Sequence, residues 1–173
     1  MKQVKKIVAS IIVIAATIST ANAQSTATAS ASATIVTPIS IAKNVDMNFG
    51  NIAVTSTGGT VILAAAGTRT ATGGVTLPVV AGTVSAAAFT VSGQSAYTYD
   101  ITLPSGNTVL SSGANSMNVN NFTASIGLTA GALSVGAPGT QSFSVGATIN
   151  VGANQAAGSY TTATPFNVTV NYN

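Results

Sequence analysis

The side chains that could perform chemistry are few. The chain of 173 residues contains no histidine and no cysteine, and its two carboxylates are Asp46 and Asp100. General acid–base and nucleophilic catalysis need a titratable group of suitable pKa beside the reacting group. Lys43 acting as a base, or Asp46 paired with Asp100 as in a glycosidase, are the candidates that this inventory leaves. Serine and threonine are plentiful, but no histidine is present to activate them, so the sequence predicts a protein that is not an enzyme.

A metal site has equally little to build on. Asp46 lies between Asn44 and Asn48, which is a weak start for a calcium site because calcium takes several oxygen ligands, usually with more than one carboxylate. Asp and Asn in a turn more often accept hydrogen bonds from backbone N–H groups. We therefore expect no metal and no cofactor.

The first 23 residues have the pattern of a secretory signal peptide. Lys2, Lys5 and Lys6 precede an apolar run over 7–18, and Ala21-Asn22-Ala23 supplies a small-x-small cleavage site. The apolar run is shorter than the roughly 20 residues of a membrane-spanning helix. We expect cleavage after Ala23 and no membrane span in the mature chain.

The charge of the chain lies mostly in that segment. The formal net charge is +3, whereas beyond residue 23 Lys43 and Arg69 balance Asp46 and Asp100. No basic patch remains that could neutralise a phosphate backbone, so we expect no nucleic-acid partner. A nearly uncharged surface of Thr, Ser, Asn, Ala and Gly offers little electrostatic repulsion and permits self-association.

The elements that must position these residues all have the period of β-strands. Short runs of alternating apolar and polar residues are separated by turns rich in Gly, Asn, Ser and Pro, and no apolar pattern at helical spacing extends over three turns. We predict an all-β antiparallel sandwich over residues 35–173. The predicted strand runs are 45–49, 60–65, 69–72, 75–80, 87–91, 97–103, 108–110, 117–126, 141–151 and 160–172.

The two ends of the mature chain alternate most regularly. In the last run one face carries apolar side chains, namely Phe166, Val168, Val170 and Tyr172. Near the start, one face carries Ala27, Ala29, Ala31, Ala33 and Ile35. Residues 24–34 fit either an extended arm before a first strand at about 35–41 or a disordered leader, and Pro38 implies an edge, bend or break.

Motifs in three parts of the chain resemble those of two bacterial families. Met47-Asn48-Phe49-Gly50 is similar to the hydrophobic-x-Phe-Gly element of archaic chaperone–usher pilins, the spore-coat-U-like group. Gly158 and Tyr160, followed by the alternating terminal run, resemble the Gly-x-Tyr ending of that group. The middle, 89–93 and 97–104, resembles an uncharacterised family of secreted bacterial domains that shares both ends.

The resemblance implies an incomplete immunoglobulin-like sandwich. A periplasmic chaperone would first supply the missing strand, and the next subunit's N-terminal arm would then replace it, with an outer-membrane usher as a further partner. This is β-strand addition, and because the contact is head-to-tail it propagates a filament. The implied donor residues are Ala27, Ala29, Ala31, Ala33 and Ile35; Phe166, Val168, Val170 and Tyr172 would border the groove; and Met47, Phe49, Gly50, Gly158 and Tyr160 form the family-like structural motif.

We therefore expect a structural subunit of a bacterial cell-surface fibre, whose partners are copies of itself. It would be exported through the inner membrane, pass through the periplasm and reach the cell surface or the medium. The alternative is a self-contained secreted surface or matrix β-domain that binds a glycan or protein. A third possibility is cross-β self-assembly, which the scattered Pro and Gly residues disfavour.

Overall fold

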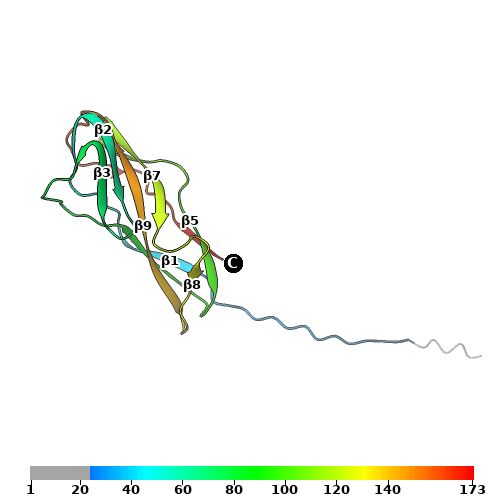
Figure 1. The fold of residues 1–173 in the computed structure, drawn as a ribbon. Coiled ribbons are helices and arrows are strands. Elements are labelled where there is room, and N and C mark those ends of the chain that lie inside the picture. Colours follow the sequence, from blue (N-terminus) through cyan, green and yellow to red (C-terminus); the bar gives the residue numbers. More distant parts are fainter. Residues whose placement is uncertain (1–23) are drawn as a thin grey trace, which may run out of the picture. The chain divides into compact units, whose positions relative to one another are not determined.

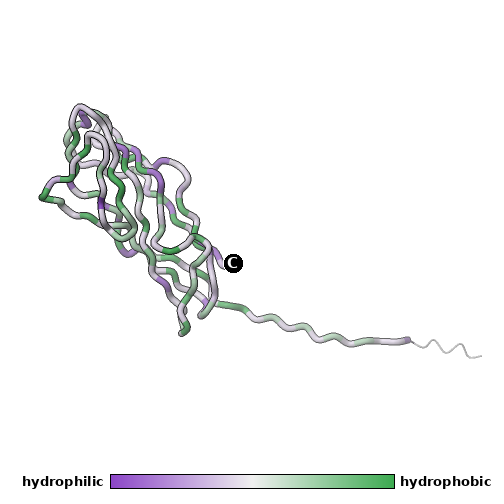
Figure 2. The backbone as a smooth tube through the Cα atoms, viewed as in Figure 1, coloured by the Kyte–Doolittle hydropathy of each residue, from purple (hydrophilic) through white to green (hydrophobic). Residues whose placement is uncertain are grey.

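The computed structural model describes residues 24–173, so the predicted signal peptide lies outside the described residues. The chain divides into two units, which meet between Thr34 and Ile35 and are described separately. In the first unit, residues 24–34 have no regular secondary structure and all of their side chains are exposed. The weak alternation of hydropathy along this segment is visible in Figure 2.

The second unit, Ile35–Asn173, consists of β-strands, and no helix occurs in the part of the chain that the structure describes (Figure 1). This confirms the predicted all-β class. No described helix is therefore long and apolar enough to cross a membrane. The strands are β1 (Ser40–Val45), β2 (Ala53–Leu63), β3 (Arg69–Thr76), β4 (Ala87–Gly93), β5 (Thr98–Thr102), β6 (Thr108–Ser112), β7 (Asn115–Ala124), β8 (Gly131–Ala132), β9 (Gly139–Val151), β10 (Thr161–Thr162) and β11 (Thr169–Tyr172).

The strands form two antiparallel sheets. The larger sheet has the order β1-β4-β9-β7-β6-β10, with β2 also paired to β9 and β3 paired to β2. The smaller sheet has the order β11-β5-β8. The antiparallel sandwich predicted from the alternating runs is confirmed at this level.

The long strand β9 organises the larger sheet. Its first half pairs with β4 and its second half with β2, while β7 lies along its other edge. The change of partner falls at Gly146, where a Cβ atom would lie 2.2 Å from the carbonyl oxygen of Leu63. Glycine is needed there because the backbone of β2 approaches too closely for a side chain.

Two core clusters lie along the sandwich, and they are covered differently. The first is enclosed between the sheets: it combines Phe89, Val91 and Phe143 from the larger sheet with Tyr99 and Val170 from the smaller one. The second lies against β2, β3, β7 and β9 and contains no residue of β5, β8 or β11. Over this second cluster the smaller sheet contributes nothing, and loop residues such as Phe49, Ile52 and Leu77 pack there instead.

The strand at the start of the domain begins later than predicted. We expected a strand at about 35–41, but pairing starts at Ser40, opposite Ser92 of β4. Pro38 accounts for the delay, because it has no N–H to donate to a ladder. Ile39 and Ile41 still pack against the first core cluster.

The terminal strand is also shorter than the alternation predicts. All four apolar residues of the run contact the first core cluster, but only Thr169–Tyr172 pairs with β5. Thr169 lies opposite Thr102, the last residue of β5, and Pro104 follows two residues later. The ladder ends because its partner strand ends, although the alternation of the run continues.

Candidate functional site

One wall of a cleft over the second core cluster is formed by the segment that follows β1. Asn48 exchanges two backbone hydrogen bonds with Ser85, of 2.8 and 3.0 Å, and Asn51 N–H donates to the carbonyl of Ala81 at 2.7 Å. Between them Gly50 adopts a φ of +66°, and its N–H donates to Asn48 Oδ1 at 2.8 Å. The Phe-Gly motif is therefore a tight turn that only glycine adopts without strain.

The same wall receives a side chain from β3. Arg69 Nη1 donates to the carbonyl oxygens of Phe49 and of Asn51, the second at 3.0 Å. These carbonyls flank Gly50, so the guanidinium binds the two sides of the turn. Arg69 is half-buried.

The opposite wall comes from the chain between β9 and β11. Tyr160 Oη donates to the carbonyl of Ala156 at 2.7 Å and accepts a hydrogen bond from Gln155 Nε2 at 2.8 Å. The Gln155 amide also reaches the carbonyl of Ser116 on β7 at 3.3 Å. β10 follows and pairs with β6 through two residues, which fixes this wall to the edge of the larger sheet.

After β10 this wall has no regular backbone hydrogen bonds. Within the described residues, Ala163 to Val168 make no backbone–backbone hydrogen bond and belong to no strand. All but Phe166 and Val168 are exposed. Met47 on the facing wall also has no backbone–backbone hydrogen bond within residues 24–173. Main chain without a backbone partner in the described chain therefore borders the cleft at Met47 on one wall and at Pro165 and Phe166 on the other.

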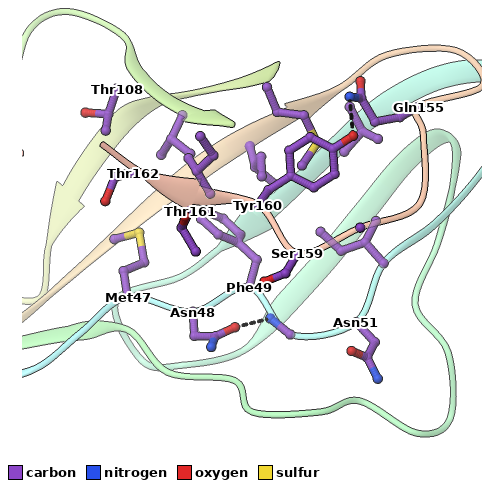
Figure 3. A pocket seen from close by; sticks show the side chains of 18 of the residues that line it. Met47, Asn48, Phe49, Asn51, Thr108, Gln155, Ser159, Tyr160, Thr161 and Thr162 are labelled. Atoms are coloured by element: carbon purple, nitrogen blue, oxygen red, sulfur yellow. Dashed lines mark hydrogen bonds between the residues drawn. The ribbon is translucent and has the colours of Figure 1, made fainter. Parts of the chain in front are cut away.

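The floor of the cleft is the second core cluster itself. Val119 of β7, Ile149 and Val151 of β9, with Leu110 and Met117 beside them, line it from below. The volume is about 990 Å³. Figure 3 shows Met47 and Phe49 from one wall and Tyr160, Thr161 and Thr162 from the other around this space.

The cleft lining contains two charged side chains. Lys43 and Asp46 line it and form an ion pair with each other, and both side chains are largely exposed. An exposed pair of this kind contributes little to stability. Apart from Tyr160, no other titratable side chain lines the cleft. The described residues contain no group of three His, Cys, Asp or Glu side chains that could hold a metal.

The one titratable side chain in the second unit with a clear pKa shift lies elsewhere. Tyr99 of β5 is fully buried in the first core cluster, and burial raises the pKa of its phenol. Its hydroxyl donates to Gln141 Oε1 at 2.8 Å, and the same oxygen accepts from Ala132 N–H at 2.8 Å. This network joins the two sheets, and none of its residues lines the cleft.

The cleft brings together six of the predicted site residues: Met47, Phe49, Gly50, Gly158, Tyr160 and Phe166. None of the others belongs to its lining. Val168 and Val170 pack in the first core cluster, and Ala27, Ala29, Ala31, Ala33 and Ile35 are exposed.

Tyr172 has a different role from the cleft residues. Its hydroxyl donates to the carbonyl of Thr37 at 2.7 Å and accepts from Gln94 N–H at 2.6 Å. A side chain at Gly93 would displace this hydroxyl, because a Cβ atom there would lie 2.2 Å from Tyr172 Oη. Tyr97 packs edge-on against the Tyr172 ring.

Sequence reasoning missed Arg69, Gln155 and Met117. The signal for Arg69 was available, since it is the single arginine of a chain that carries four charged side chains beyond residue 23. Gln155 and Met117 had no local signal: their place in the cleft depends on which strands pair. Chemically, the arrangement suits binding of an extended segment with apolar side chains on one face, because the floor is apolar and main chain at Met47 and at Phe166 has no backbone partner within the described residues.

Comparisons with known proteins place most of this chain in one family. A protein-family profile described as a domain of unknown function, DUF4402, matches residues 39–172. No curated protein and no solved structure matches the chain. The match covers the described β domain from just before β1 to the end of β11, and the chain therefore belongs to the DUF4402 family.

Proposed function

We propose that the mature chain is a structural subunit of a bacterial cell-surface fibre, and that the N-terminal segment of one copy adds as a strand in the cleft of the next. The observation that carries this proposal is the cleft of about 990 Å³, which has an apolar floor and, at Met47 on one wall and Pro165 and Phe166 on the other, main chain without a backbone partner among the described residues. An inserted strand would gain hydrogen bonds from those walls and bury alternate side chains on the floor. It would act as the missing member of the layer above the second core cluster.

The segment 24–35 supplies a donor of suitable chemistry. Its side chains are exposed and nearly all small and uncharged, and Ala27, Ala29, Ala31, Ala33 and Ile35 share one face when the chain is extended. Each buried methyl group is worth about 0.8 kcal/mol, so four alanines contribute roughly 3 kcal/mol and Ile35 about 2 more. Ordering the segment offsets part of this, and most of the affinity would come from backbone pairing.

The resemblance to archaic chaperone–usher pilins supports the same assembly. In that arrangement a periplasmic chaperone fills the cleft until an outer-membrane usher exchanges it for the next subunit. The segment and the cleft are different surfaces, so the contact is heterologous and extends as a fibre unless the rotation closes a ring.

The test uses the mature chain, 24–173, and a synthetic peptide of residues 24–37. We expect the peptide to bind and to raise the melting temperature, and deletion of 24–34 to abolish oligomers. Met117→Glu places a charge on the cleft floor and should abolish peptide binding. Ile62→Glu is the matched control, because Ile62 is exposed and lies outside the cleft lining.

A stable monomer that ignores both the peptide and the deletion would refute strand donation. The first core cluster, enclosed between two sheets without any added strand, would then favour the self-contained surface or matrix domain that binds a glycan or protein.

A further inference from the structure

Arg69 is the one positive side chain of the described residues that has no carboxylate partner. The single ion pair within residues 24–173 joins Lys43 to Asp46, and Arg69 Nη1 instead binds the backbone carbonyls of Phe49 and Asn51. Burying part of a charge is unfavourable unless hydrogen bonds compensate for lost water. Its position therefore depends on these two carbonyls.

The geometry of the contact matches guanidinium chemistry. One Nη atom carries two N–H groups, and a single Nη1 reaches two acceptors that are separated by one residue. A hydrogen bond from a charged donor is stronger than a neutral one. Lysine, whose ammonium group is compact and lies at the end of a flexible chain, does not reproduce this fixed fork.

Both carbonyls belong to the wall of the cleft. Phe49, Gly50 and Asn51 all line it, and the left-handed turn at Gly50 is closely packed. A Cβ at Gly50 would lie 2.3 Å from the carbonyl oxygen of Ala81 and 3.0 Å from Arg69 Nη1. The turn is thus held between the Ala81 loop on one side and the guanidinium on the other.

The geometry points to Arg69 as a positioning residue that sets the distance between the two walls of the cleft. Without the guanidinium the turn keeps its bonds to Ser85 and Ala81 but loses the contact that draws it toward β3. The wall would then shift, and an inserted strand could not bond both sides at once. This inference rests on the proposed strand addition and assigns the residue that prepares the cleft for it.

Three variants of the mature chain test whether Arg69 positions the cleft wall or only stabilises the fold. Arg69→Met keeps the length of the side chain but removes all donors, and Arg69→Gln restores an amide donor. Val91→Ala is the matched destabilised control, because Val91 is fully buried in the first core cluster and outside the cleft lining. Two readouts are measured: affinity for the 24–37 peptide, and native-state exchange of the Asn51 amide, which bonds to Ala81.

We expect Arg69→Met to weaken binding of the 24–37 peptide at least tenfold. The same variant should accelerate hydrogen exchange of the Asn51 amide more than Val91→Ala does. Arg69→Gln should recover part of both, and Val91→Ala should lower the melting temperature with unchanged peptide affinity. Equal Asn51 exchange in Arg69→Met and Val91→Ala, or wild-type peptide affinity in Arg69→Met, would overturn the assignment. If the wild type binds no peptide, the fibre proposal fails and Asn51 exchange alone decides whether Arg69 holds the wall.

Discussion

Replacement of Tyr172 by phenylalanine removes one oxygen atom from a junction of three chain segments. That hydroxyl bonds to backbone groups of Thr37 and Gln94, at 2.7 and 2.6 Å. Phenylalanine retains the ring and its edge-on packing against Tyr97, whose centroid lies 5.5 Å away. The substitution therefore tests the hydrogen bonds almost in isolation from the packing.

The magnitude follows from the two lost bonds. Each net hydrogen bond contributes about 1 kcal/mol, and leaving a partly buried group without a partner adds to the loss. We expect the free energy of unfolding to fall by roughly 2 kcal/mol. For a domain of this size, about 3 °C is lost per kcal/mol, so the melting temperature should fall by roughly 6 °C.

Tyr97→Phe is the matched control. It removes the same atom from the other ring of the pair, and the Tyr97 hydroxyl makes no hydrogen bond within the described residues. Chemical denaturation of both variants should give a loss of about 2 kcal/mol for Tyr172→Phe and less than about 0.5 kcal/mol for Tyr97→Phe. Equal losses would mean that the Tyr172 hydroxyl does not join the segments as described.

Three further outcomes are expected. Gly50→Ala should destabilise the domain by about 2–4 kcal/mol in denaturant titrations, because the new Cβ would sit in a left-handed backbone conformation and overlap with Ala81. Gly67 is also left-handed but lies in open space, so Gly67→Ala should destabilise the domain by only about 1 kcal/mol. Burial raises the folded-state pKa of Tyr99, so the contribution of this phenol to stability is complete below the unfolded pKa of about 10 and is lost as pH rises through the folded pKa. Tyr99→Phe should therefore lower the free energy of unfolding at neutral pH and flatten its decline at alkaline pH. An unchanged slope in the variant would refute this. Addition of the 24–37 peptide should slow amide exchange over 166–168, where no backbone–backbone bond exists, and unchanged exchange with bound peptide would argue against strand pairing there.

The sequence predicted where strands form better than it predicted which layer covers each part of the larger sheet. The run 141–151 was predicted as a strand, and β9 confirms it, with Phe143, Val145 and Ile149 buried. A glycine directly after an alternating run indicates a bulge or a turn, and at Gly50 the positive φ shows which residue reverses the chain. Both signals are local, because side-chain period and backbone conformation are set by neighbouring residues.

The cleft could not be predicted in the same way. Its floor depends on strands β6, β7 and β9 lying side by side, and its walls come from residues about 110 positions apart in the sequence, such as Phe49 and Tyr160. The alternation of apolar and polar residues in the sequence does not indicate that the smaller sheet leaves the second core cluster uncovered. The two unequal layers arise from strand lengths, since β5 and β11 together cover only the first cluster.

The last strand is shorter in the structure than its alternation predicts, and the reason is the length of its partner strand. The alternation of Phe166, Val168, Val170 and Tyr172 is that of one continuous strand, yet pairing begins only at Thr169 because β5 has ended. The three residues before it keep the period of a strand but have no backbone partner. A strand inserted in the cleft would lie beside Phe166, which lines it, and would supply that partner. Residues 166–168 therefore alternate like a strand but have no ladder partner in the described chain, and we propose that strand addition from a second copy supplies that partner.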